Sequence, residues 1–204
     1  MLLFFPVKQV IKENRSWLIM AAAIFTICAV VFYYSTAAAQ QTAEETFENH
    51  LNQLFELFSF ILETKPVIGA LFLFMNNYLS MVQMLLLGVV AGISPLITLG
   101  FNGALVGMLL SLTVQEGLPL LPLIIFGILP HGIFELFAFF LCGAFGLKFG
   151  YHCIASPLPG KTRLESYRHI WKEAISVLPL VTALLLAAAF IEIMITAKLI
   201  KQFL

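Results

Sequence analysis

His131 and Glu135 are the two residues whose types and spacing could do chemistry inside this strongly apolar chain. They stand four positions apart after Pro130, so on a helix that begins there both side chains lie on one face, one turn apart. Such a pair can relay protons, bind an ion or substrate near the start of a broken helix, or form a structural polar cluster that fixes helix register. The spacing leaves these alternatives open.

The other members of this candidate polar cluster are Asn76, Asn77 and Asn102, which also occur in apolar stretches. His131 and Glu135 supply two metal ligands, whereas zinc needs three or four, and asparagine is a poor third. The pair also lacks the second histidine of an HExxH motif. We therefore expect no metal, no other cofactor and no catalytic residue.

Glu192 is a further acidic residue inside an apolar stretch. Either its carboxylate joins the cluster around His131, or its side chain extends along its helix to the membrane surface. We favour the surface, because Lys198 follows within two helical turns.

Composition identifies the kind of protein that must position these groups. Of the 204 residues 61% are hydrophobic and only 11% are charged, whereas soluble domains carry about a quarter charged residues. The formal net charge is zero, so no basic excess is available for a nucleic acid. The three cysteines form no redox or zinc motif. A multi-pass protein in contact with membrane lipid is the expectation.

We predict an all-α polytopic membrane bundle, a single domain over residues 1–204 with about five transmembrane spans. The fourth apolar stretch is too long for one straight helix, so we expect a helix to end near Leu129 and another to begin at Pro130. The first stretch is too long for a signal peptide, and we treat it as a retained span. The predicted spans are residues 17–39, 67–92, 96–114, 118–147 and 174–197.

Cations near the ends of spans predict the orientation in the cell membrane, because they are retained in the cytoplasm. Residues 1–16 hold three Lys or Arg and residues 148–173 hold five, whereas residues 40–66 hold one lysine beside five glutamates. We therefore predict a cytoplasmic N-terminus, a cytoplasmic connector over 148–173 and an external segment over 40–66.

The external segment repeats apolar residues at three- and four-residue steps between its glutamates, a pattern typical of an amphipathic helix. Leu51, Phe55 and Phe58 are the candidate partner-docking residues, and packing against the chain's own bundle is the alternative. Every segment outside the spans is too short to bury a core of its own. A water-exposed enzyme domain is thereby excluded, and we predict that the protein is not an enzyme.

Glycines four residues apart predict close helix packing, because they let two helix backbones approach each other. This packing can occur within one chain or in a homodimer, and we favour the single chain. The three pairs are Gly88 with Gly92, Gly103 with Gly107, and Gly146 with Gly150.

The block from Leu71 to Gly150 resembles the stage II sporulation protein M family of integral membrane proteins. The resemblance rests on the order and spacing of Asn76-Asn77, Gly88 with Gly92, Asn102-Gly103 with Gly107, and above all the string LPHGIFEL at 129–136. It implies a membrane anchor that, in spore formers, holds two peptidoglycan-degrading proteins, D and P, during forespore engulfment. Members also occur in organisms without spores, archaea included. The resemblance implies no catalytic residue.

Two functions remain in competition. The first is a non-enzymatic membrane scaffold or anchor for proteins D and P or their equivalents. The alternative is a carrier or channel for a small solute or ion that uses the buried His131/Glu135 cluster. An intramembrane hydrolase ranks last, because the spans hold neither a recognisable nucleophile nor a full set of metal ligands.

Overall fold

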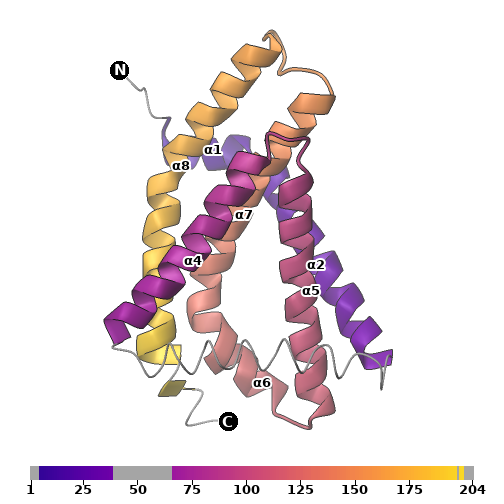
Figure 1. Ribbon diagram of the computed structural model, residues 1–204, viewed down its shortest axis with the longest axis vertical. Helices are drawn as coiled ribbons and strands as arrows, with labels where there is room; N and C mark the ends of the chain where they lie inside the picture. The colour runs from indigo at the N-terminus through magenta and orange to yellow at the C-terminus, as the bar shows by residue number, and fades with distance from the viewer. Residues whose placement is uncertain (1–4, 39–65, 197, 200–204) are drawn as a thin grey trace.

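The computed structural model describes residues 5–38, 66–196 and 198–199, and this part of the chain is helical with no strand. The predicted all-α class is therefore confirmed. The segment holding Leu51, Phe55 and Phe58 lies outside the described residues, so the docking prediction stays a prediction. The elements, drawn in Figure 1, are α1 (Val7–Glu13), α2 (Arg15–Ala38), α4 (Pro66–Leu87), α5 (Ile93–Gln115), α6 (Leu120–Pro122), the π-helical η1 (Leu123–Ile128), α7 (Leu129–Ile154), α8 (Arg163–Ile191) and the π-helical η2 (Glu192–Thr196).

Five of the described helices are long and apolar enough to cross a membrane, as predicted. Large apolar side chains cover their outer faces: Ile97 and Phe101 of α5 are 64% and 61% exposed. An apolar exterior of this kind is compatible with the hydrocarbon core of a bilayer. Backbone polar groups there must form their hydrogen bonds within the protein, as they do in helices. The five spans are Arg15–Ala38, Pro66–Leu87, Ile93–Gln115, Leu120–Ile154 and Arg163–Thr196.

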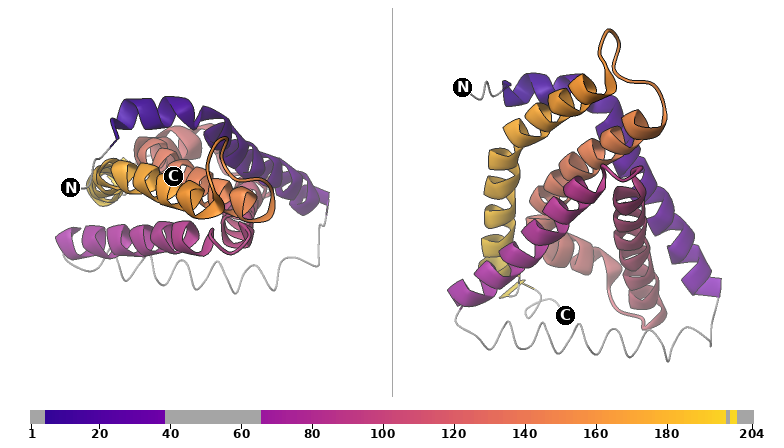
Figure 2. Two further views of the ribbon diagram at one scale, coloured as in Figure 1. Left: turned by 90° about the horizontal axis from the view of Figure 1, so that it is seen from above. Right: turned by 45° about the horizontal axis from the view of Figure 1, so that its top comes forward.

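Helix α7 forms the centre of the bundle and packs against α2, α4, α5 and α8. Seen from above, α7 and α8 lie between α2 on one side and α4 on the other (Figure 2). Every residue from Leu141 to Gly150 is buried, and Phe145 and Phe149 are among the largest fully buried side chains. The short helix α1 lies across the end of the bundle where α7 ends and α8 begins (Figure 1).

Two of the glycine pairs face each other where α7 passes the turn between α4 and α5. A Cβ atom added to Gly88 would lie 2.5 Å from the Cα of Gly146, and one added to Gly150 would lie 2.2 Å from the Cα of Gly92. Real Cβ atoms do not come that close to a backbone, so no larger residue fits without a shift of the chain. These backbones are in contact within one chain.

The third pair brings α5 against α2. A Cβ atom on Gly103 would lie 2.2 Å from the carbonyl oxygen of Phe25, and one on Gly107 would lie 2.0 Å from that of Ala29. Small residues at such a crossing let the two helices pack over much of their length, as the broad α2–α5 contact illustrates.

The fourth span is broken, as predicted. Helix α7 begins at Leu129, and Pro130 lies in its first turn. Immediately before it η1 winds as a π-helix from Leu123 to Ile128, and α6 lies at an angle to α7 (Figure 1). The break is therefore a wide turn of π-helix and not a gap in the helix.

The predicted connector over 148–173 is mostly helical. Helix α7 continues to Ile154, and α8 begins at Arg163 behind a capping box in which Thr162 and Glu165 exchange side-chain and backbone hydrogen bonds. Only residues 155–162 lie outside the helices. Four of the five cations of the connector therefore stand on α7 or α8, and Lys161 lies between the two helices.

Candidate functional site

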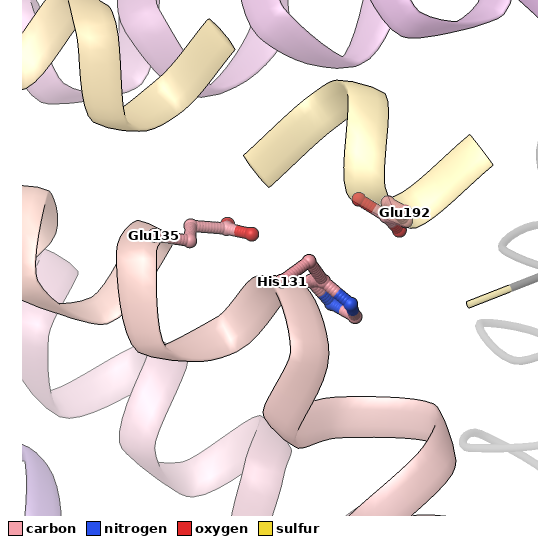
Figure 3. A group of neighbouring side chains, drawn as sticks. All are labelled: His131, Glu135 and Glu192. Atoms are coloured by element: carbon pink, nitrogen blue, oxygen red, sulfur yellow. The ribbon is translucent and has the colours of Figure 1, made fainter. Parts of the chain in front are cut away.

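Three ionisable side chains meet between the start of α7 and the end of the last span. His131 and Glu135 project from successive turns of α7, and Glu192 is the first residue of η2 (Figure 3). One potential ligand atom from each of them lies within 4.8 Å of the others. We call His131, Glu135 and Glu192 the open cluster.

The position of Glu192 corrects our expectation that its side chain extends to the membrane surface. We had expected Glu192 at the membrane surface because Lys198 follows six residues later. The contact between Glu192 and His131 instead depends on how the last span packs against α7, which the local sequence does not reveal. Both π-helical segments contribute to that contact: η1 ends just before α7, η2 begins at Glu192, and the two segments touch. Single π turns inside α-helices often mark functional positions.

Two members of the open cluster are oriented by hydrogen bonds from other elements. Asn77 of α4 donates from Nδ2 to Oε1 of Glu135 over 2.9 Å. The Thr196 hydroxyl of η2 lies 3.3 Å from Nδ1 of His131, 65 residues away in the sequence. Thr196 itself is only 2% exposed. In the described structure these bonds leave Oε2 of Glu135 and Nε2 of His131 without a hydrogen-bond partner, so both atoms are available to a ligand.

A cavity of about 270 Å³ adjoins the open cluster on the side of α2 and α5. His131, Glu135 and Asn102 are the polar residues on its wall, and the rest of the wall is apolar, Phe25 and Ile128 included. At about 30 Å³ for each water molecule, this space has room for several waters or a small solute.

The asparagines of the predicted cluster have three different positions. Asn77 contacts Glu135 directly, as described above. Asn76 is exposed, and its Nδ2 lies 3.5 Å from Oδ1 of Asn77. Asn102 donates to the carbonyl of Thr98 on its own helix over 2.8 Å and reaches the cluster only through the cavity.

The open cluster carries more acidic than basic groups. Two carboxylates stand beside one imidazole, and no Lys or Arg pairs with either carboxylate among residues 5–38, 66–196 and 198–199. In a low-dielectric interior, like charges at this separation repel strongly unless a cation or a proton offsets them. The arrangement can therefore hold a cation or exchange protons.

A second polar cluster was not anticipated from the sequence. Lys148 of α7 donates from Nζ to Oε2 of Glu173 on α8 over 2.5 Å and to Oδ1 of Asn14 over 2.7 Å. Asn14, between α1 and α2, donates in turn to Oε1 of Glu173 over 3.0 Å. The three residues are 2–6% exposed. We call Lys148, Glu173 and Asn14 the closed cluster.

Comparison with known proteins identifies the family of this chain. The family model described as stage II sporulation protein M matches residues 18–197. The chain is also 34% identical over 126 residues to the uncharacterized protein MJ0793 of Methanocaldococcus jannaschii, an alignment that covers 61% of this chain and 70% of that protein. No solved structure matches the chain. The chain belongs to the stage II sporulation protein M family.

Proposed function

We propose that this multi-pass membrane protein is a non-enzymatic anchor, whose rigid bundle holds a partner-binding segment at one face of the cell membrane. The observation that carries the proposal is the fully buried stretch Leu141–Gly150, held by facing glycines and by the closed cluster. An anchor needs such rigidity. In the described part of the chain, the longest segment between helices is residues 155–162, too short to bury a core of its own.

The cytoplasmic placement of the N-terminus is part of this proposal. The two basic segments, residues 5–15 and 148–172, stand at the same end of the bundle, where α1 crosses it (Figure 1). Cations concentrated at one end favour that end as the cytoplasmic one. With native cysteines replaced, Lys161→Cys is expected to resist a membrane-impermeant thiol reagent in intact cells, whereas Glu116→Cys reacts. The reverse labelling pattern would contradict the orientation.

The partners in this proposal are peptidoglycan-degrading proteins equivalent to D and P, bound through Leu51, Phe55 and Phe58. The support is membership in the family together with the amphipathic pattern of that segment. Replacing all three residues by Ala is expected to abolish co-purification of such a partner expressed from the same organism. A matched control replaces Ile97, Phe101 and Leu109, three exposed apolar residues of α5, by Ala. Retained capture by the first variant would count against docking there.

A second candidate function, carriage of an ion or small solute, is favoured by one specific observation. The open cluster lies within the fourth and fifth candidate spans, beside a cavity and at the start of a helix that follows a π-helical break. Interrupted helices near the midplane supply the ion and substrate sites of many transporters. In proteoliposomes Glu135→Gln is expected to abolish flux while folding is retained, and Glu116→Gln, an exposed residue at the end of α5, is the control. Equal flux in both variants would exclude this function.

A further inference from the structure

We infer that the open cluster is a binding site for one divalent transition-metal cation of the Mn²⁺, Fe²⁺ and Zn²⁺ class. The inference goes beyond anchoring, and it holds whether or not the bound ion is carried across the membrane. It reverses the expectation of no metal, which rested on His131 and Glu135 supplying only two ligands. Glu192 supplies the third.

The ligand set selects this class of metal. One imidazole nitrogen and two carboxylate oxygens are a mixed set, typical of Mn²⁺, Fe²⁺ and Zn²⁺. Ca²⁺ prefers six to eight oxygen ligands, and Mg²⁺ takes oxygen in near-ideal octahedra. The cluster has no thiolate, the ligand that selects soft metals such as Cu⁺.

The second feature that points to a metal is the support behind the ligands. Metal-bound histidines usually engage their other ring nitrogen in a hydrogen bond, and metal-bound carboxylates are hydrogen-bonded in turn. Both supports are present: Thr196 at Nδ1 of His131 and Asn77 at Oε1 of Glu135. Each comes from an element other than α7, so three elements together hold the His131 ring and the Glu135 carboxylate in place.

The geometry needs only a small closure to hold an ion. A tetrahedral metal at about 2.1 Å from its ligands places those atoms about 3.4 Å from each other. In the structure they lie within 4.8 Å. Inward movement of roughly 1 Å is within the reach of glutamate side-chain rotation. Glu192 has no hydrogen-bond partner among the described residues, so no hydrogen bond in this part of the chain has to break for its side chain to turn.

The charge of the open cluster and the space beside it also favour a bound metal ion. A divalent cation offsets the repulsion between the two carboxylates, which no described Lys or Arg relieves. The adjoining cavity of about 270 Å³ is lined by His131 and Glu135, so it offers room for water beside these two ligands.

The test is metal binding by the full chain in lipid nanodiscs, purified with a tag that lacks histidine and stripped with a chelator. Titration calorimetry with Zn²⁺ and loss of the free Mn²⁺ paramagnetic signal both measure stoichiometry and affinity. We expect one equivalent per chain for either ion, retained in excess Mg²⁺. Affinity falls at least about tenfold in His131→Ala, Glu135→Gln and Glu192→Gln, and is unchanged in Glu116→Gln.

Several outcomes would overturn the site: no saturable binding, displacement by Mg²⁺ at equal concentration, or binding that all three cluster variants share with the wild type. A second measurement excludes misfolding as the cause of lost binding. Zn²⁺ or Mn²⁺ raises the thermal unfolding temperature of the wild type and of Glu116→Gln but not that of Glu192→Gln, whose temperature without metal is no lower than the wild type's. Because no ion gradient is applied, failure of the site and failure of carriage are separate results.

Discussion

The closed and the open cluster stand near opposite ends of α7. They differ in whether their buried charged groups are paired with groups of opposite charge. From His131 to Lys148 α7 rises about 25 Å. In the closed cluster one ammonium meets one carboxylate, and Asn14 joins both. In the open cluster two carboxylates share one imidazole next to a cavity.

The difference separates structure from function. A buried group with a fixed structural role ends with its charge balanced and its hydrogen bonds made, because an isolated charge in a low-dielectric interior is costly. The closed cluster meets this condition. The open cluster has two carboxylates for one imidazole and lies next to a cavity. These are the properties of a binding site for a cation or a proton.

The largest difference between the clusters is expected when one charge is removed from each. Lys148→Met leaves the Glu173 carboxylate buried without its partner and should lower the free energy of unfolding by about 3–5 kcal/mol. Glu135→Gln relieves repulsion and should change it by less than about 1 kcal/mol. Unfolding by SDS titration measures both. The double variant Lys148→Met/Glu173→Leu should recover much of the stability lost in Lys148→Met. Equal losses in Lys148→Met and Glu135→Gln would contradict the difference between the closed and the open cluster.

A second difference concerns packing around the two ends of α7. In Gly150→Ala the new Cβ atom meets the backbone of Gly92 at 2.2 Å, so we expect a loss of about 1–3 kcal/mol. In Gly132→Ala it meets only the Ile128 side chain at 3.4 Å, an ordinary contact, and stability should change by about 0.5 kcal/mol or less. The thermal unfolding temperature in detergent compares the two. A larger loss in Gly132→Ala would mean that the open end is the tighter one.

Asn14 of the closed cluster and Asn102 beside the open cluster allow the same comparison for single hydrogen bonds. Asn14→Ala removes the amide that joins Lys148 to Glu173 and should cost roughly 1–2 kcal/mol. Asn102→Ala removes an amide that bonds only to the carbonyl of Thr98 on its own helix, so the expected loss is below about 1 kcal/mol. SDS titration again provides the measurement. Matching losses would indicate that Asn14 does not hold the closed cluster together.

Thr196, which contacts His131 of the open cluster, is expected to matter little for stability and more for metal binding. Thr196→Val loses the hydrogen bond to His131 and should change the free energy of unfolding by only about 0.5 kcal/mol. Its affinity for Zn²⁺ should nevertheless fall about tenfold, because the ring of His131 is no longer oriented. Thr182→Val, whose hydroxyl bonds to Leu178 of its own helix, is the matched control in calorimetry. An unchanged affinity in both would remove Thr196 from the site.

The fold was predictable from the sequence because its determinants are local. Apolar runs of bilayer length define the five spans, and Pro130 marks the break, since a proline constrains its own helix and the residue before it. The π-helical form of η1 was not predictable, because the winding of a helix interior depends on what packs against it.

Long-range pairs account for what the sequence could not predict. Spacing placed His131 and Glu135 on one face, but Glu192 reaches them only through the path of the last span. Lys148 and Glu173 fell inside the predicted connector because the apolar runs end at Leu147 and resume at Ala174. Only the burial of α7 reveals that they bind each other.

The ion pair of the closed cluster has a consequence for the biosynthesis of the protein. Lys148 is synthesised 25 residues before Glu173, and a lysine placed alone in a spanning helix opposes insertion by up to about 2.5–3.5 kcal/mol. Insertion of α7 and α8 together as a hairpin, with the two charges already joined, would avoid that cost.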